Sequence, residues 1–318
     1  MGKEVDVQGV DRFVWQYWNV KVDTTGAPRS LPEIVLRLTG QIEKNRGQVL
    51  KTIWEETEQN RSVMMQVGFS VGAGKYTTHT LHLRQNIAAN SPRANSSAKA
   101  RMAIIIDDFG AMMPGTMEML AIDRPLTVAV LPYRSTTAKE AQLAQQRGHQ
   151  VILHLPMEPH NPKTSPGPNA IKSGMEPQEV KELFIKAIEQ VPQAKGVNNH
   201  MGSKATEDRV VVESILREVK ARNLFFIDSH TSTKSVVPQV AAQLGVPSAE
   251  NYLFLDNVDE LEAVKGEIRN LAKVALTRGR VIGIGHVRVN TAQAIKEMIP
   301  QLEEQGIRLV YVSELLKK

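Results

Sequence analysis

Two adjacent carboxylates, Asp107 and Asp108, are the first residues of this sequence whose type and spacing indicate chemistry. They directly follow the apolar run Ile104–Ile106. Neighbouring carboxylates repel one another unless a cation or a proton lies between them, so the pair is unfavourable in a simple turn. A functional role, as a metal ligand or as an acid or base, is therefore favoured over a turn.

A histidine and a glutamate form the second candidate pair. His154 is followed four residues later by Glu158, with Pro156 between them and Pro159 after them. Because proline interrupts a regular helix, these two residues are not a helical i,i+4 pair. A stiff loop that presents two metal ligands is favoured over a loop in which both side chains have only structural partners.

Polar residues also follow several later apolar runs. His286 comes after Gly283-Ile284-Gly285, whose small residues let another group approach closely, and a functional role is favoured for it. His200 and His230 are equally compatible with a metal ligand and with a structural residue. Asp256 is interpreted as a helix cap or a turn residue. The same kind of position is occupied by Asn198, Asn199, Asp228 and Ser229.

The elements that must position these residues alternate along the chain. Short apolar runs, typical of buried strands, are separated by segments with helical periodicity. This alternation predicts a parallel sheet, either open and doubly wound or closed into a barrel. In both arrangements chemistry gathers at the carboxyl ends of the strands, which is where the candidate residues fall. The predicted strands lie near Ala103–Ile106, Thr127–Leu131, Gln150–Leu155, Gly196–Asn198, Leu224–Ile227, Tyr252–Leu255, Val281–Ile284 and Arg308–Val312.

A smaller region precedes this one. Residues 87–100 are small, polar and without periodicity, which is typical of a linker. Residues 1–86 are predicted to form a small α+β domain of unknown role, and residues 101–318 the larger domain. The expected elements of the small domain are a strand at Phe13–Val20, a helix from Ser30 to about Glu58, and strands near Val63–Phe69 and Thr77–Leu83.

Composition and charge exclude several classes of protein. The chain has 318 residues, 42% of them hydrophobic, which is enough for one large core or two smaller ones. There is no cysteine, so any metal must be held by His, Asp and Glu. A net charge of +5 without a basic cluster argues against nucleic-acid binding. No apolar run reaches the length of about 18 residues that a membrane span needs, and no signal peptide is visible.

Several of these segments together resemble the motifs of polysaccharide deacetylases, the metal-dependent carbohydrate esterases. From Arg101 to Lys318 the sequence is similar to the divergent branch of that family. The segments that carry the resemblance are, in order, Ile104-Ile105-Ile106-Asp107-Asp108-Phe109-Gly110, His154-Leu155-Pro156-Met157-Glu158-Pro159, Asn198-Asn199-His200-Met201-Gly202-Ser203, Phe226-Ile227-Asp228-Ser229 and Gly285-His286. Taken together these motifs are specific, whereas any one of them alone would be weak.

The resemblance implies an irregular (β/α) barrel, preceded here by the small α+β domain, and a divalent metal that is usually zinc. It identifies Asp107 as the general base, Asp108 and His154 as metal ligands, and His286 as the general acid. The family's arginine-containing third motif is absent, and Asn198–Ser203 stands in its place.

Glu158 stands where the family normally has a second histidine. As a ligand it would complete a set of one histidine and two carboxylates, a harder set that lets manganese, iron or cobalt compete with zinc. If Glu158 does not bind the metal, His200 or His230 becomes the candidate for the third ligand. The residues expected around the site are Asn199, His200, Asp228 and His230.

The expected function is that of a hydrolase acting on C–N bonds. Its substrate would be an N-acetylated, or otherwise acylated, cell-surface polysaccharide or oligosaccharide, which implies a location in the periplasm or cell envelope. The alternative is a non-catalytic carbohydrate-binding or envelope-associated protein on the same scaffold, indicated by Glu158 and the missing arginine motif. An enzyme for small phosphorylated substrates is disfavoured, because no glycine-rich phosphate loop follows a predicted strand.

Overall fold

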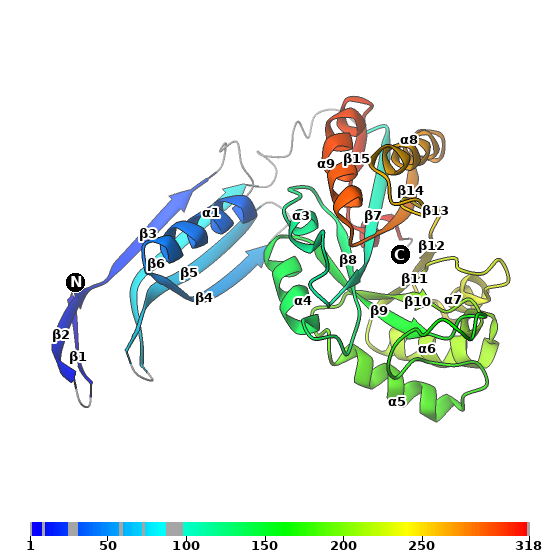
Figure 1. Ribbon diagram of the computed structural model, residues 1–318, viewed down its shortest axis with the longest axis horizontal. Helices are drawn as coiled ribbons and strands as arrows, with labels where there is room; N and C mark the ends of the chain where they lie inside the picture. Colours follow the sequence, from blue (N-terminus) through cyan, green and yellow to red (C-terminus); the bar gives the residue numbers. More distant parts are fainter. Residues whose placement is uncertain are drawn as a thin grey trace. The chain divides into compact units, whose positions relative to one another are not determined.

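The computed structural model describes residues 2–7, 10–24, 31–56, 60–71, 74–86 and 98–316. The chain divides into two compact units, residues 1–97 and 98–318 (Figure 1). Most of the predicted linker, residues 87–97, lies outside the described residues, and so does Ser30. The domain limits at 86 and 101 stay predictions. In the described part of the chain, no helix combines the length and the apolar character that crossing a membrane requires.

The described part of the N-terminal unit has a four-stranded sheet with one helix against it and a separate antiparallel pair, β1 and β2. The sheet has the order β3-β6-β5-β4, and helix α1 packs on it through a cluster that includes Leu31, Val63, Met65 and Leu83. The single strand predicted at Phe13–Val20 is two strands, β2 and β3. The elements are β1 (Gly2–Val7), β2 (Val10–Gln16), β3 (Trp18–Asp23), α1 (Leu31–Lys44), β4 (Gln48–Glu56), β5 (Asn60–Val71) and β6 (Gly74–Asn86).

The predicted helix of this unit is too long, because the structure has strand β4 in its second half. Helix α1 stops where Arg46 takes a left-handed conformation, with φ 62°, and Gly47 donates its N–H to Ile42 O at 2.8 Å. After Gly47 the chain is rich in β-branched and aromatic residues, which pack better in a sheet than in a helix. These residues are Val49, Thr52, Ile53 and Trp54.

The C-terminal unit is built on a curled sheet of parallel strands. The strand order is β12-β11-β10-β9-β8-β7-β14-β13, with β15 paired to the start of β7. This order follows the chain cyclically, which is the order of a barrel and not of a doubly wound sheet. In residues 98–316 no ladder joins β12 to β13, so the barrel is open at that seam. The prediction of an irregular (β/α) barrel after a small α+β domain is confirmed.

Most strands of this unit match the predicted apolar runs. The strand predicted near Arg308–Val312 is shorter, since β15 ends at Leu309 and Val312 lies in a 3-10 helix, and β12 was not predicted because its Ser-Ala-Glu sequence has no apolar pattern. The strands are β7 (Ala100–Phe109), β8 (Thr127–Val130), β9 (Gln150–Met157), β10 (Gly196–Met201), β11 (Phe225–Asp228), β12 (Ser248–Glu250), β13 (Leu253–Phe254), β14 (Arg280–His286) and β15 (Ile307–Leu309). The helices are α3 (Thr116–Leu120), α4 (Thr137–Gln146), α5 (Pro177–Ile188), η1 (Ala205–Glu207), α6 (Arg209–Ala221), α7 (Val237–Leu244), α8 (Leu261–Arg278), α9 (Val289–Glu304) and η2 (Val312–Leu315).

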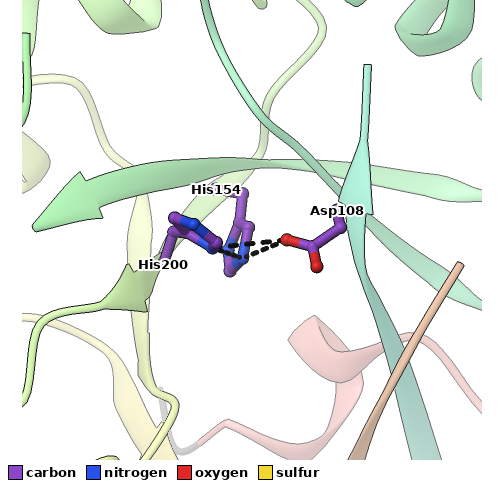
Figure 2. A group of neighbouring side chains, drawn as sticks. All are labelled: Asp108, His154 and His200. Atoms are coloured by element: carbon purple, nitrogen blue, oxygen red, sulfur yellow. Dashed lines mark hydrogen bonds and ion pairs between the residues drawn. The ribbon is translucent and has the colours of Figure 1, made fainter. Parts of the chain in front are cut away.

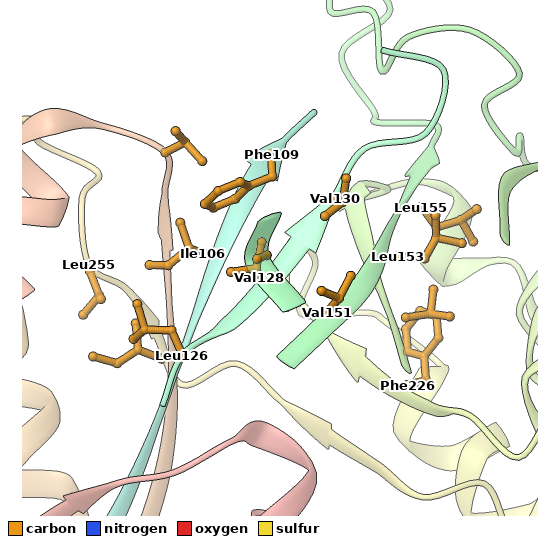
Figure 3. Close-up of a cluster of buried hydrophobic side chains, with 14 of the residues drawn as sticks. Ile106, Phe109, Leu126, Val128, Val130, Val151, Leu153, Leu155, Phe226 and Leu255 are labelled. Carbon is orange, nitrogen blue, oxygen red and sulfur yellow. The ribbon is translucent and has the colours of Figure 1, made fainter. Parts of the chain in front are cut away.

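Both faces of this sheet are buried, and this is what positions the site. Side chains such as Ile106, Val128 and Leu153 form a core with the surrounding helices (Figure 3). On the other face, Ile105 belongs to a second cluster that is closed by Val312 of η2. Two-sided burial requires apolar residues along each strand. Polar side chains therefore gather at the carboxyl ends, where the strands leave the core.

Candidate metal centre and active site

A β-bulge at the end of β7 brings both aspartates to one place. In a regular strand adjacent side chains point to opposite faces. Here the pairing of β7 with β8 shifts register between Ile106 and Phe109, and Asp108 has a φ of 71°. As a result, Asp107 Oδ2 lies 3.6 Å and Asp108 Oδ1 lies 3.4 Å from the same atom, His154 Nε2.

Glu140 of helix α4 holds the turn that follows the bulge. This residue has no exposed surface. Its carboxylate accepts hydrogen bonds from the backbone N–H groups of Gly110 at 2.9 Å and Met112 at 2.6 Å, and from the Thr136 hydroxyl. No feature of the sequence marks this glutamate, because a single charged residue in a helical pattern is normally on the surface.

Three ligand atoms converge at the carboxyl edge of the sheet: Asp108 Oδ1 from β7, His154 Nε2 from β9 and His200 Nδ1 from β10 (Figure 2). We call this group the ligand triangle. Asp108 Oδ1 is 3.4 Å from His154 Nε2 and 3.3 Å from His200 Nδ1, and the two imidazole nitrogens are 3.0 Å apart. The two rings meet edge to face, with centroids 4.8 Å apart.

The ligand triangle fits a divalent metal ion. Ligand atoms about 2.0–2.2 Å from a tetrahedral ion are about 3.3 Å from one another, which is close to all three separations. Asp108 Oδ1 is buried and has no hydrogen-bond partner among the residues that the structure describes, as expected of an oxygen that faces a cation. Two imidazoles and one carboxylate are also a ligand set known from catalytic zinc sites, with positions left for water and substrate.

At two corners of the triangle the electrostatics point the same way, whereas at the third, His154, burial lowers the pKa but Asp107 and Asp108 raise it more. Burial raises the pKa of Asp108, but the contacts with His154 and His200 lower it much further, so the net pKa lies well below its ordinary range. Burial lowers the pKa of His200, and the charge of His154 adds to this against the opposing effect of Asp108. An ionised Asp108 and a neutral His200 are the protonation states that bind metals.

Asp107 lies buried beside the triangle, with 2% of its surface exposed. Its Oδ1 accepts a hydrogen bond from Asn198 Nδ2 at 2.8 Å. Burial raises the pKa of this carboxyl, and the nearby His154 and His286 only partly oppose the rise. A carboxylate with a raised pKa is a better proton acceptor near neutral pH, so Asp107 is suited to act as a general base.

His286 at the end of β14 is held by a buried carboxylate, Asp256. Asp256 Oδ1 accepts a hydrogen bond from His286 Nδ1, and Oδ2 accepts one from the His286 backbone N–H, both at 2.7 Å. The Thr291 hydroxyl donates to the same Oδ2, also at 2.7 Å. Helix α8 begins only at Leu261, so the interpretation of Asp256 as a helix cap or turn residue is wrong. Its position at a strand end was the available indication of a functional partner.

The Asp256 contact sets both the tautomer and the charge of His286. Because Nδ1–H points at the carboxylate, Nε2 is the ring nitrogen left for a substrate. Burial lowers the pKa of His286, but the bond to Asp256 and the charge of Asp107 raise it more, so the net pKa lies above its ordinary value. His286 is thereby suited to carry a proton and to donate it.

The structure does not bring Glu158 to the ligand triangle. Strand β9 continues through Pro156 to Met157, which places Glu158 about 13 Å beyond His154 along an extended chain. Its carboxylate accepts the Ser173 N–H at 2.9 Å and pairs with Lys204 Nζ at 3.0 Å. The third corner of the triangle is occupied by His200 instead.

The other residues expected around the site stabilise the strand ends. Asn199 accepts the Ser229 N–H at 2.9 Å and donates to Met201 O at 2.7 Å. Asp228 accepts the backbone N–H of His230 at 2.8 Å and the Ser235 hydroxyl at 2.6 Å. The His230 side chain is exposed and is not part of the triangle.

Comparisons with known proteins fall on this unit. The family model of the divergent polysaccharide deacetylases matches residues 104–316. The chain is 32% identical over 221 residues to an uncharacterized Haemophilus influenzae protein, covering 69% of this chain and 78% of that protein. It is 31% identical over 218 residues to YibQ of Escherichia coli, covering 69% of this chain and 68% of YibQ. The solved structure of an uncharacterized Agrobacterium tumefaciens protein has a TM-score of 0.66 at 23% identity, covering 70% of this chain and 92% of that one.

Proposed function

Since this chain belongs to the divergent polysaccharide deacetylase family, we propose that its C-terminal unit is a metal-dependent hydrolase that removes acetyl or other acyl groups from an N-acetylated cell-surface polysaccharide. The observation that carries the proposal is the ligand triangle of Asp108, His154 and His200, flanked by a buried base and by a histidine paired with a carboxylate. A polysaccharide of the cell surface would be met in the periplasm or envelope, so an extracytoplasmic location is part of the proposal.

The residues around the triangle divide the chemistry of amide hydrolysis between them. A divalent metal, when bound, supplies a Lewis acid that polarises the acyl carbonyl and makes a water more acidic. Asp107 accepts the proton of the attacking water, because burial has raised its pKa. His286 donates a proton from Nε2 to the departing amine nitrogen, while Asp256 compensates the charge of the imidazolium. Amine expulsion needs such a donor because an amide anion is a very poor leaving group.

Zinc is the metal that this ligand set favours. With His200 in place of Glu158, the triangle has two imidazole nitrogens and one carboxylate oxygen. That is a softer set than one histidine with two carboxylates, and imidazole suits zinc well. Manganese, iron and cobalt bind the same kinds of atoms, and an experiment on the metal should therefore include them.

The test is release of acetate from acetylated chitooligosaccharides or peptidoglycan fragments by the full chain loaded with zinc. Asp107→Asn should lower kcat by about 100-fold or more while the zinc content stays unchanged, because only the base is removed. His200→Ala should lose both zinc and activity. Glu158→Gln removes the same charge as Asp107→Asn, but from a carboxylate that pairs with Ser173 and Lys204, and it should keep both zinc and activity.

Two results would count against this function. One is the absence of acetate release with every divalent metal tried; the other is an Asp107→Asn variant that is as active as the wild type. Glycan binding that persists in a chelator and in Asp108→Ala would favour the alternative, a non-catalytic carbohydrate-binding protein on a deacetylase scaffold.

A further inference from the structure

Asn198 joins the proposed base to a proposed metal ligand through one buried amide. It is the third residue of β10 and has no exposed surface. Its Nδ2 lies 2.8 Å from Asp107 Oδ1 and 3.3 Å from Ser229 Oγ, and its Oδ1 lies 2.8 Å from His154 Nδ1. A single neutral side chain therefore touches both halves of the catalytic machinery.

The surrounding hydrogen bonds fix which way this amide points. An ionised Asp107 can only accept, so Asn198 must turn its NH2 group toward that carboxylate. The Ser229 hydroxyl donates its own hydrogen to Asn199 O at 2.8 Å, which leaves its oxygen to accept the second N–H of Asn198. The amide oxygen is then left facing His154 Nδ1. That ring nitrogen must carry the hydrogen of a neutral imidazole.

This orientation has one consequence at the metal centre and one at the base. With its hydrogen on Nδ1, neutral His154 directs the lone pair of Nε2 toward Asp108 Oδ1 and His200 Nδ1, the other two corners of the triangle. At the base, the bond from Asn198 occupies Oδ1 of Asp107 and leaves Oδ2 on the side of the triangle, 3.6 Å from His154 Nε2.

We propose that Asn198 is a positioning residue that holds His154 in the tautomer that binds metal and turns the free oxygen of Asp107 toward the reacting water. The inference rests on the proposed function only in its second half. Its first half concerns metal binding and can be measured whether or not acetate is released. If Asn198 only packed between β7, β9 and β10, its substitution would lower stability. It would not affect the His154 tautomer and the orientation of Asp107 separately.

Two substitutions of Asn198 separate the roles. Asn198→Leu removes both donor and acceptor at similar volume. Asn198→Asp keeps an acceptor for His154 Nδ1, and at neutral pH it places a second carboxylate against Asp107, so the two share a proton. Asn251→Leu is the matched control, because Asn251 is also a buried amide, 3% exposed, next to the end of a neighbouring strand, and its side-chain N–H donates to Ser229 O at 3.4 Å rather than to the catalytic groups.

The measurements are calorimetric titration of the apo-protein with zinc, ¹⁵N chemical shifts of the His154 ring, and turnover at saturating zinc. Asn198→Leu should weaken zinc binding by about 10–100-fold and give a mixture of His154 tautomers. Asn198→Asp should bind zinc within about 3-fold of the wild type or more tightly, since a carboxylate–histidine–metal arrangement is favourable. Both variants should lower kcat by about 10-fold or more with KM nearly unchanged.

Several outcomes would overturn the inference: wild-type zinc affinity in Asn198→Leu, equal losses of affinity in Asn198→Asp and Asn198→Leu, or an equal loss in Asn251→Leu. If Asn198→Leu does not fold, the Asp variant and the ¹⁵N shifts of the wild type decide, because a neutral wild-type His154 with its hydrogen on Nε2 alone contradicts the proposed tautomer. Failure of the deacetylase function looks different. The wild type would then bind zinc and respond to Asn198 as described, but release no acetate.

Discussion

At the scale of single residues, the site depends on which ring nitrogen of each histidine is already hydrogen-bonded to a neighbouring side chain. Asp256 is hydrogen-bonded to Nδ1 of His286, and Asn198 is hydrogen-bonded to Nδ1 of His154. In each histidine the hydrogen bond at Nδ1 orients the ring, so that Nε2 points into the site and the tautomer is defined. The two histidines therefore differ in their partners: His286 is paired with a carboxylate and His154 with a neutral amide.

The Asp256–His286 pair predicts a change in the pH dependence of turnover. As the proposed general acid, His286 must be protonated, and Asp256 raises its pKa, so we expect the wild type to keep its activity to a higher pH than an unpaired histidine would allow. Asp256→Asn removes the charge and keeps the shape, and should therefore move the alkaline limb of the kcat/KM profile to lower pH.

The control for this change is Asp259→Asn, which removes the same charge from an exposed residue of the same loop. Asp259 accepts a hydrogen bond from Asn290 and does not contact His286. It should leave the alkaline limb in place. An alkaline limb that stays at the wild-type pH in Asp256→Asn would show that His286 is not the group that titrates there.

At the scale of elements, the decisive feature is the bulge that ends β7. It allows two consecutive aspartates to act on one point, and it is maintained by a carboxylate from another element, Glu140 of α4. Three donors converge on that carboxylate, two of them backbone N–H groups of the turn. A buried N–H without an acceptor is costly, so this turn has little freedom to relax while α4 stays docked.

Glu140→Gln should therefore destabilise the C-terminal unit and loosen the metal site. A glutamine has only one acceptor oxygen, so either Gly110 or Met112 loses its partner, at a cost of about 1–3 kcal/mol in the free energy of unfolding. Zinc affinity should fall by about 10-fold because Asp108 is less well positioned. Urea unfolding and calorimetric titration measure the two effects.

Glu213→Gln on α6 serves as the comparison, since this glutamate pairs with Arg217 on the helix surface. An exposed ion pair of this kind contributes little, so neither stability nor zinc affinity should change appreciably. Equal stability of the Glu140 and Glu213 variants would show that Glu140 does not hold the turn after the bulge.

At the scale of the whole molecule, the proposed metal centre joins strands that are far apart in the sequence. Asp108 is on β7, His154 on β9 and His200 on β10, and only the folded barrel brings their atoms together. A ligand that binds the folded state alone stabilises it by mass action, by about 2.7 kcal/mol at 100 times its Kd. Metal binding and folding of the C-terminal unit should therefore be coupled.

This coupling predicts that zinc raises the melting temperature of the C-terminal unit and that a chelator reverses the rise. For a domain of this size each kcal/mol corresponds to about 2–4 °C, so a shift of about 5–10 °C is expected at 100 times Kd. Calorimetry with and without zinc provides the measurement. Asp108→Ala should abolish the response. A shift of equal size in that variant would mean that zinc stabilises the protein from another site.

The sequence by itself determined that strands and helices alternate in the barrel and where most of its strands lie, with β12 and the limits of β15 as the exceptions. Its strands are buried on both faces, so each one is a short apolar run that can be recognised locally. Because both faces of each strand are buried, polar residues are expected only near the strand ends. Asp107, Asp108, His154 and His286 were predicted as site residues for that reason. In the small domain the sequence was less decisive, because residues 48–56 allow a helical pattern that sheet packing overrides.

Only the tertiary structure decided which of these strand-end residues meet. His200 and not Glu158 completes the ligand triangle, because β9 runs through Pro156 to Met157 and carries Glu158 away to Lys204. Asp256 is a partner of His286 and not a helix cap, since α8 begins only at Leu261. The direction of a side chain at a strand end depends on where that strand bends and stops. Contacts with neighbouring strands and helices determine this, and they are not encoded in any local stretch of sequence.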